Sequence, residues 1–145
     1  MRGSWEAHLT RNTWTILFAA WTLAGISTFG ALFVGEVMGQ MPCVLCWYQR
    51  IAMFPLALIL GVAAFRNDAG IWRYALPVAL AGLAVAGYHS LMYAGVLTAP
   101  IEPCRAGPSC SGDGMVVLGV PLPFMATASF AAISTLLAIL ARNPK

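Results

Sequence analysis

The chain has 145 residues, of which 60% are hydrophobic and 9% are charged, and its formal net charge is +3. A soluble domain carries about 25% charged residues and about 45–50% apolar residues, and a chain this small could not bury so much apolar surface in water. The composition therefore excludes a water-soluble globular protein and predicts an integral membrane protein, and the scattered basic residues exclude a nucleic-acid partner.

Four apolar stretches follow one another along the chain, at about residues 13–34, 46–65, 71–97 and 118–141. Each is long enough to cross a bilayer as a helix. The first is longer than the apolar core of a cleaved signal peptide, so we expect a retained span. Only Gln49 and Arg50 interrupt the second, the polar residues 66–70 end it, and Pro77 predicts a kink in the third. The sequence thus predicts an all-α, four-helix transmembrane bundle in one domain, residues 1–145, with close helix packing at Gly82 and Gly87.

Most of the basic residues lie at the chain ends or between the second and third spans: Arg2, Arg11, Arg66, Arg73, Arg142 and Lys145. In a four-span chain all these segments are on one side of the membrane. The positive-inside rule then predicts that both termini are cytoplasmic. Residues of about 35–45 and 98–117 become extracytoplasmic loops, and all four cysteines lie at the oxidising face.

The first cysteine pair, Cys43 and Cys46, forms a C-x-x-C in the segment Met-Pro-Cys-Val-Leu-Cys-Trp-Tyr-Gln-Arg. Such a pair is a redox dithiol, half of a zinc site or a structural staple. If a helix begins at Pro42, both cysteines lie in its first turn, on one face and within disulfide reach. The helix N-terminus favours a thiolate there. Arg50, four residues after Cys46, adds a cation that would attract an oxygen ligand; otherwise it reaches the lipid headgroups.

The second pair, Cys104 and Cys110, flanks a segment rich in proline and glycine that can close a small disulfide. It is either a loop clamp or, with the first pair, part of a thiol–disulfide relay. A relay needs a final electron acceptor, for which a membrane quinone is suited. His89 is the only histidine in a predicted span, and we expect it to donate a proton or a hydrogen bond to the quinone, the alternative being a core histidine.

The residues from Pro42 to Arg50 resemble the signature of the DsbB/BdbC family of disulfide-bond formation proteins, and residues 103–112 resemble the short second loop of the BdbC branch. The similarity extends over all four spans and includes Pro-Leu-Pro-Phe at residues 121–124. It implies a protein dithiol:quinone oxidoreductase in the bacterial cytoplasmic (inner) membrane. Such an enzyme reoxidises an extracytoplasmic thioredoxin-like thiol oxidase of the DsbA/BdbD kind and so supports disulfide formation in secreted proteins.

The resemblance also implies a role for each site residue. Cys104 would form a mixed disulfide with the partner, and Cys110 would then attack Cys43. This attack would release Cys46 as a thiolate beside the quinone, ubiquinone or menaquinone, whose oxygen Arg50 would polarise. No metal is expected.

Three alternatives compete with this function. A membrane scaffold stapled by zinc through four cysteines would use the same two pairs, but thiolates at an oxidising face disfavour it. A transporter usually needs ionisable groups near the bilayer midplane, and the first and fourth spans carry none. A vitamin-K-epoxide-reductase-like quinone oxidoreductase would carry its C-x-x-C on a late helix, whereas here the motif opens the second.

Overall fold

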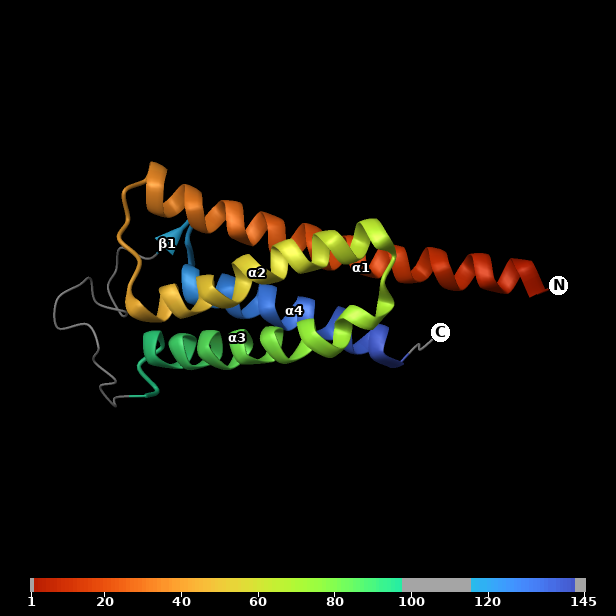
Figure 1. Cartoon of the computed structure of the whole chain (residues 1–145). Helices are drawn as coiled ribbons and strands as arrows, with labels where there is room; N and C mark the ends of the chain where they lie inside the picture. The colour runs from red at the N-terminus through yellow and green to blue at the C-terminus, as the bar shows by residue number, and fades with distance from the viewer. Residues whose placement is uncertain (1, 98–115, 143–145) are drawn as a thin grey trace.

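The computed structural model describes residues 2–97 and 116–142, with side chains from residue 12 onward. The long helices of these ranges are α1 (Arg2–Leu32), α2 (Val44–Arg66), α3 (Trp72–Tyr93) and α4 (Leu122–Arg142). The short elements are the π-helical turn η1 (Phe33–Val37), the 3-10 turn η2 (Ala69–Ile71) and a hairpin of β1 (Val116–Val117) and β2 (Val120–Pro121). Figure 1 shows the four helices running lengthwise along one bundle.

All four helices are long and apolar enough to cross a membrane: Asn12–Val37, Val44–Arg66, Ala69–Tyr93 and Leu122–Arg142. Large apolar side chains cover the outside of the bundle, and Phe65 exposes 83% of its surface. In water this surface would be costly, whereas lipid tails solvate it. The predicted four-span membrane bundle is therefore confirmed.

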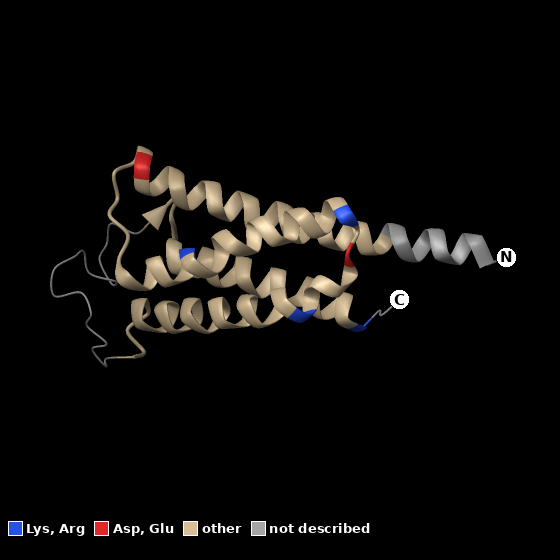
Figure 2. Ribbon diagram, viewed as in Figure 1, with Lys and Arg blue, Asp and Glu red and all other residues tan. Residues whose placement is uncertain are grey.

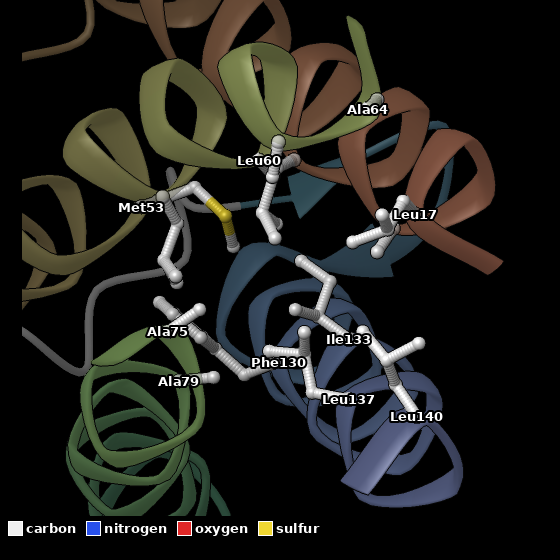
Figure 3. Packing of buried hydrophobic residues seen from close by; sticks show 14 of the residues in the cluster. Leu17, Met53, Leu60, Ala64, Ala75, Ala79, Phe130, Ile133, Leu137 and Leu140 are labelled. Atoms are coloured by element: carbon white, nitrogen blue, oxygen red, sulfur yellow. The ribbon is translucent and has the colours of Figure 1, made fainter. Parts of the chain in front are cut away.

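Side chains of all four helices meet in one apolar core (Figure 3). α2 and α4 contribute large side chains, for example Leu60 and Leu137, whereas α3 contributes the alanines Ala75 and Ala79. Small residues let helix backbones approach closely, which stabilises membrane helices through van der Waals contact. Close packing predicted at Gly82 is confirmed, because a Cβ there would overlap the Phe130 ring of α4. At Gly87 the prediction is wrong, since a Cβ there would meet no atom within 4 Å.

The turn between α2 and α3 has the polar, helix-ending character that the sequence predicts. Asn67 adopts the left-handed conformation, with φ of 51°, and its N–H donates to the last turn of α2. The Asp68 side chain then accepts a hydrogen bond from the Gly70 N–H at 2.9 Å and opens η2. Pro77 lies inside α3, which continues as a helix to Tyr93.

The two ends of the bundle differ in connectivity and charge. The start of α1, the α2–α3 turn and the end of α4 share one end, and the α1–α2 connection and the hairpin share the other (Figure 1). Arg66, Arg73 and Arg142 lie at the first end, whereas Glu36 lies at the second (Figure 2). The C-x-x-C is therefore at the end that holds Glu36, where α2 begins.

Candidate active site

The C-x-x-C lies at the start of α2, in a position that differs slightly from the predicted one. The helix begins at Val44 rather than at Pro42, and Cys43 is its N-cap residue, with φ of −70° and ψ of 170°. Its carbonyl accepts the hydrogen bond from the Trp47 N–H at 3.1 Å. The extended backbone of Cys43 turns its side chain inward, where it packs with Leu45 and is 1% exposed.

The two sulfur atoms of the motif are in direct contact. Cys43 Sγ donates a hydrogen bond to Cys46 Sγ at 3.3 Å. A disulfide needs about 2.0 Å between the sulfurs, so the pair is shown as a dithiol that a small movement would close. Cys46 is half-buried, in contrast to the buried Cys43, so the two sulfurs of one motif face different surroundings.

Two further buried polar side chains, His89 and Gln49, are linked to Cys43. His89 of α3 is 0% exposed, and its Nε2 lies 3.9 Å from Cys43 Sγ. Its Nδ1 lies 3.0 Å from Nε2 of Gln49 of α2, which is 8% exposed. Burying such groups costs free energy unless they are hydrogen-bonded. The three side chains thus form a chain of contacts from Gln49 through His89 to Cys43.

Arg50 of α2 is held against the end of α1. Its Nη2 donates to the carbonyl oxygen of Ala31 at 2.7 Å, and its Cζ lies 5.5 Å from the centroid of the Trp47 ring. A Cβ at Gly35 would lie 2.9 Å from the same Nη2, so only glycine leaves this space open. Gly35 belongs to the π-turn η1, and such turns often occur at functional sites. The guanidinium is therefore fixed in place with further N–H groups available to a ligand.

A cavity of about 340 Å³ lies between α1, α2 and α4, and both Cys46 and Arg50 line it. Cys46, Gln49 and Arg50 contribute polar atoms to it, and most of the other lining residues are apolar, among them Met53 and Phe130. Ile26, which also lines it, is 66% exposed on the outer surface of the helix bundle. The cavity therefore lies beside apolar surface that faces lipid, and it fits an apolar ligand with a few polar atoms.

The predicted site residues are only partly brought together by the described chain. Cys46 and Arg50 line the cavity, whereas His89 does not line it and contacts Cys43 instead. Cys104 and Cys110 lie outside the described residues. Gln49 was not among the predicted site residues, although its polar side chain beside Arg50 in an otherwise apolar run is a signal that could have identified it.

One set of described side chains has the spacing of a metal site. The ligand atoms of Cys43, Cys46 and His89 all lie within 4.8 Å of one another. Two thiolates and an imidazole can hold zinc when a fourth ligand is added. The predicted four-cysteine alternative cannot be compared with this set, because two of its members lie outside the described residues.

Comparison with known proteins finds relatives that match most of the chain. The family model described as "Disulfide bond formation protein DsbB" matches residues 10–140. A "Probable disulfide formation protein" of Metapseudomonas resinovorans is 55% identical over 133 residues, which are 90% of this chain and 92% of that protein. "Disulfide bond formation protein C" of Bacillus subtilis (strain 168) is 39% identical over 121 residues, 83% of this chain and 88% of that protein.

No solved structure matches the chain significantly. The family match nevertheless covers all four membrane helices and the C-x-x-C, and the similar proteins are matched over most of their length. Family and geometry agree on a multi-pass membrane protein with a disulfide oxidoreductase function. The chain therefore belongs to the DsbB family of disulfide bond formation proteins.

Proposed function

We propose that this chain is a membrane thiol:quinone oxidoreductase that reoxidises a thioredoxin-like dithiol oxidase outside the cytoplasm. The observation that carries the proposal is the shared cavity, in which the half-buried Cys46 and the fixed cation Arg50 line the same apolar space. A thiol beside a lipid-accessible cavity can pass electrons to a membrane-soluble acceptor. Neither a zinc-stapled scaffold nor a transporter requires a thiol and a cation that line the same lipid-accessible cavity.

The residues of the cavity fit a quinone. A quinone has an apolar ring and tail and two carbonyl oxygens, and it supplies a two-electron, two-proton acceptor when bound. Met53 and Phe130 would contact the ring, and Arg50 would donate to an oxygen. The exposed Ile26 marks the side from which a lipid-soluble ligand would enter.

Each residue at the cavity has one task in this proposal. Arg50, tied to the Ala31 carbonyl, is held before the ligand arrives, so little conformational freedom is lost on binding. The two sulfurs lie 3.3 Å apart, so a thiolate on Cys46 can accept a hydrogen bond from the Cys43 thiol. The start of α2 and the nearby guanidinium further favour negative charge on Cys46.

Electrons would reach this pair from Cys104 and Cys110, which lie outside the described residues. A partner thiolate attacks Cys104, breaks the Cys104–Cys110 bond and releases Cys110 as a thiolate. Cys110 attacks Cys43, breaks the Cys43–Cys46 bond and releases Cys46. The second partner thiolate breaks the mixed disulfide and releases Cys104, which attacks Cys110 and releases Cys43.

The cycle closes when the Cys43–Cys46 dithiol gives two electrons and two protons to the quinone and becomes a disulfide again. The net reaction is partner dithiol plus quinone giving partner disulfide plus quinol. Atoms and electrons balance without a metal or a further oxidant. The proposed setting is the bacterial cytoplasmic membrane, with the C-x-x-C end of the bundle outside.

The test uses the purified full chain in lipid nanodiscs, with a short-chain ubiquinone or menaquinone and a reduced thioredoxin-like thiol oxidase. We expect one quinone to be reduced for each partner disulfide formed, measured by quinone absorbance and by thiol titration. Cys46→Ser should abolish quinone reduction, and Cys104→Ser should abolish exchange with the partner while quinone binding persists. Undiminished turnover in the Cys43→Ser/Cys46→Ser double variant would refute the proposal.

A further inference from the structure

We propose that His89 is a hydrogen-bond donor that stabilises Cys43 as a thiolate, and that Gln49 is the positioning residue that sets the His89 tautomer for this task. The inference rests on the proposed function, because it assigns the proton chemistry of one cysteine in that cycle. It differs from the sequence-based expectation that His89 serves the quinone. The observation that supports it is a pair of buried side-chain contacts, one between Gln49 and His89 and one between His89 and Cys43.

The tautomer follows from the type of atom at each contact. Nε2 of Gln49 is an amide nitrogen, which only donates hydrogen bonds. At 3.0 Å from it, Nδ1 of His89 must accept, so in the neutral ring the proton is on Nε2. That N–H lies 3.9 Å from Cys43 Sγ, within hydrogen-bonding range for sulfur. The amide of Gln49 thus directs a donor at the sulfur of Cys43.

Burial makes this donor necessary for Cys43. The side chain of Cys43 is 1% exposed and that of His89 is 0% exposed, so bulk water does not reach either. A buried anion without hydrogen bonds is costly. A hydrogen bond to a thiolate is also stronger and shorter than one to a neutral thiol. We therefore expect the Nε2–Sγ contact to tighten when Cys43 loses its proton.

The proposed cycle gives Cys43 this charge at defined moments. Cys43 leaves as a thiolate when Cys104 attacks Cys110, and it loses its proton again when the pair would give two electrons and two protons to the quinone and become a disulfide. In the reduced pair between these steps, Cys43 Sγ lies 3.9 Å from Nε2 of His89 and 3.3 Å from Cys46 Sγ, so His89 stabilises the reduced form. The two sulfurs of the pair thus have separate partners: Cys46 has the cavity with Arg50, and Cys43 has His89.

The measurement that tests this inference is the reduction potential of the Cys43–Cys46 couple. It uses the full chain with Cys104→Ser and Cys110→Ser, free of quinone, with a metal chelator, equilibrated in thiol redox buffers and quantified by alkylation and mass spectrometry. His89→Ala removes the donor and destabilises the reduced form. We expect the equilibrium to shift about tenfold toward the disulfide, which lowers the potential by about 30 mV for a two-electron couple.

Two substitutions of Gln49 separate positioning from packing. Gln49→Met keeps the length of the side chain but removes the amide, so we expect the potential to fall as in His89→Ala, though by less. Gln49→Glu keeps the length of the side chain but reverses the hydrogen bond, because its carboxylate accepts from Nδ1–H. Nε2 can then donate to Cys43 only after it takes the thiol proton, and the carboxylate stabilises the resulting imidazolium beside the thiolate. The potential should therefore stay nearer to that of the parent than in Gln49→Met. Tyr88→Phe is the matched control. Tyr88 packs against the cluster of Cys43 and Leu45, and its buried hydroxyl has no hydrogen-bond partner in the described part of the chain, so its removal should leave the potential unchanged.

An unchanged potential in a folded His89→Ala variant would overturn the inference, as would equal potentials for Gln49→Met and Gln49→Glu. If the cavity left by His89→Ala unfolds the chain, as a thermal melt would show, the two Gln49 variants decide alone. The measurement uses neither quinone nor partner. A chain that shifts as expected but reduces no quinone would therefore refute the proposed function and not this inference.

Discussion

At the residue scale, the four-residue motif contains two cysteines with different surroundings. Cys43 is buried against His89, and Cys46 lines an apolar cavity with Arg50. Two cysteines with the same surroundings, as in a flexible loop, would be equally able to form each bond of the exchange. Because α2 holds each sulfur against a separate partner, we expect Cys46 to act toward the acceptor in the cavity and Cys43 to act in disulfide exchange.

Arg50 gives the first prediction at this scale, and Arg73 provides its matched control. Both arginines lie over a tryptophan ring, with Cζ at 5.5 Å from Trp47 for Arg50 and at 5.9 Å from Trp72 for Arg73. Only Arg50 lines the cavity. Loss of a charged hydrogen bond costs about 1.5–3 kcal/mol, so Arg50→Met should raise the KM for quinone about tenfold or more, and Arg73→Met should leave it unchanged.

The assay for this pair is steady-state quinone reduction at varied quinone concentration. Exchange with the partner, followed in a single turnover without quinone, should be nearly unaffected by Arg50→Met. Equal KM values for the two variants would mean that Arg50 only anchors the start of α2 to α1 through Ala31.

At the element scale, the contact between α3 and α4 depends on Gly82. A Cβ at this position would overlap the ring of Phe130, which is 1% exposed in the core. Overpacking of this kind costs about 1–3 kcal/mol. We therefore expect Gly82→Ala to lower the thermal midpoint in detergent, whereas Gly87→Ala in the same helix, with nothing within 4 Å, should leave it unchanged or raise it slightly.

A second substitution checks that the cause is this ring. Phe130→Leu in the Gly82→Ala background should recover part of the lost stability, because the smaller side chain makes room for the new methyl group. Strictly additive losses would show that the two positions are not coupled and would contradict the packing explanation.

The contact between η1 and α2 depends on Gly35 in a different way. A Cβ there would lie 2.9 Å from Nη2 of Arg50, the far end of a flexible side chain. We expect Gly35→Ala to displace the guanidinium from Ala31 and to raise the KM for quinone several-fold, as Arg50→Met does, with little change in thermal midpoint. Gly25→Ala, which meets nothing within 4 Å, is the control; if it gave the same KM, the role of Gly35 would be disproved.

At the scale of the whole molecule, the distribution of charge predicts the orientation of the bundle. Arg66, Arg73 and Arg142 lie at the end shared by the start of α1 and the end of α4 (Figure 2). The positive-inside rule therefore predicts a cytoplasmic location for this end. A green fluorescent protein fused after Lys145 should fluoresce in bacteria, and alkaline phosphatase fused there should be inactive. The reverse result would contradict both the orientation and an extracytoplasmic C-x-x-C.

The sequence by itself determined the class of this protein. Charge-free apolar runs of span length lead to membrane helices whatever the tertiary structure, because the backbone must satisfy its hydrogen bonds within each helix in lipid. The polar turn at residues 66–70 and the motif from Pro42 to Arg50 are equally local signals, so the second span, its end and its family could be recognised without a fold. Gly82 and Gly87 could not be told apart, since their difference depends on what faces them.

The tertiary structure alone decided which residues share a site. His89 is 43 residues from Cys46 along the chain, and only the packing of α3 on α2 directs its ring to Cys43 and away from the cavity. Gln49 has a role because the buried imidazole of His89 needs a hydrogen-bond partner. Gly35 has a role because the guanidinium of Arg50, from another helix, occupies the space that a Cβ would fill. These contacts join positions far apart in the chain, and burial makes their hydrogen bonds obligatory. Local sequence patterns can mark Gln49 and His89 as polar positions in apolar runs, but they do not show which atoms these side chains contact.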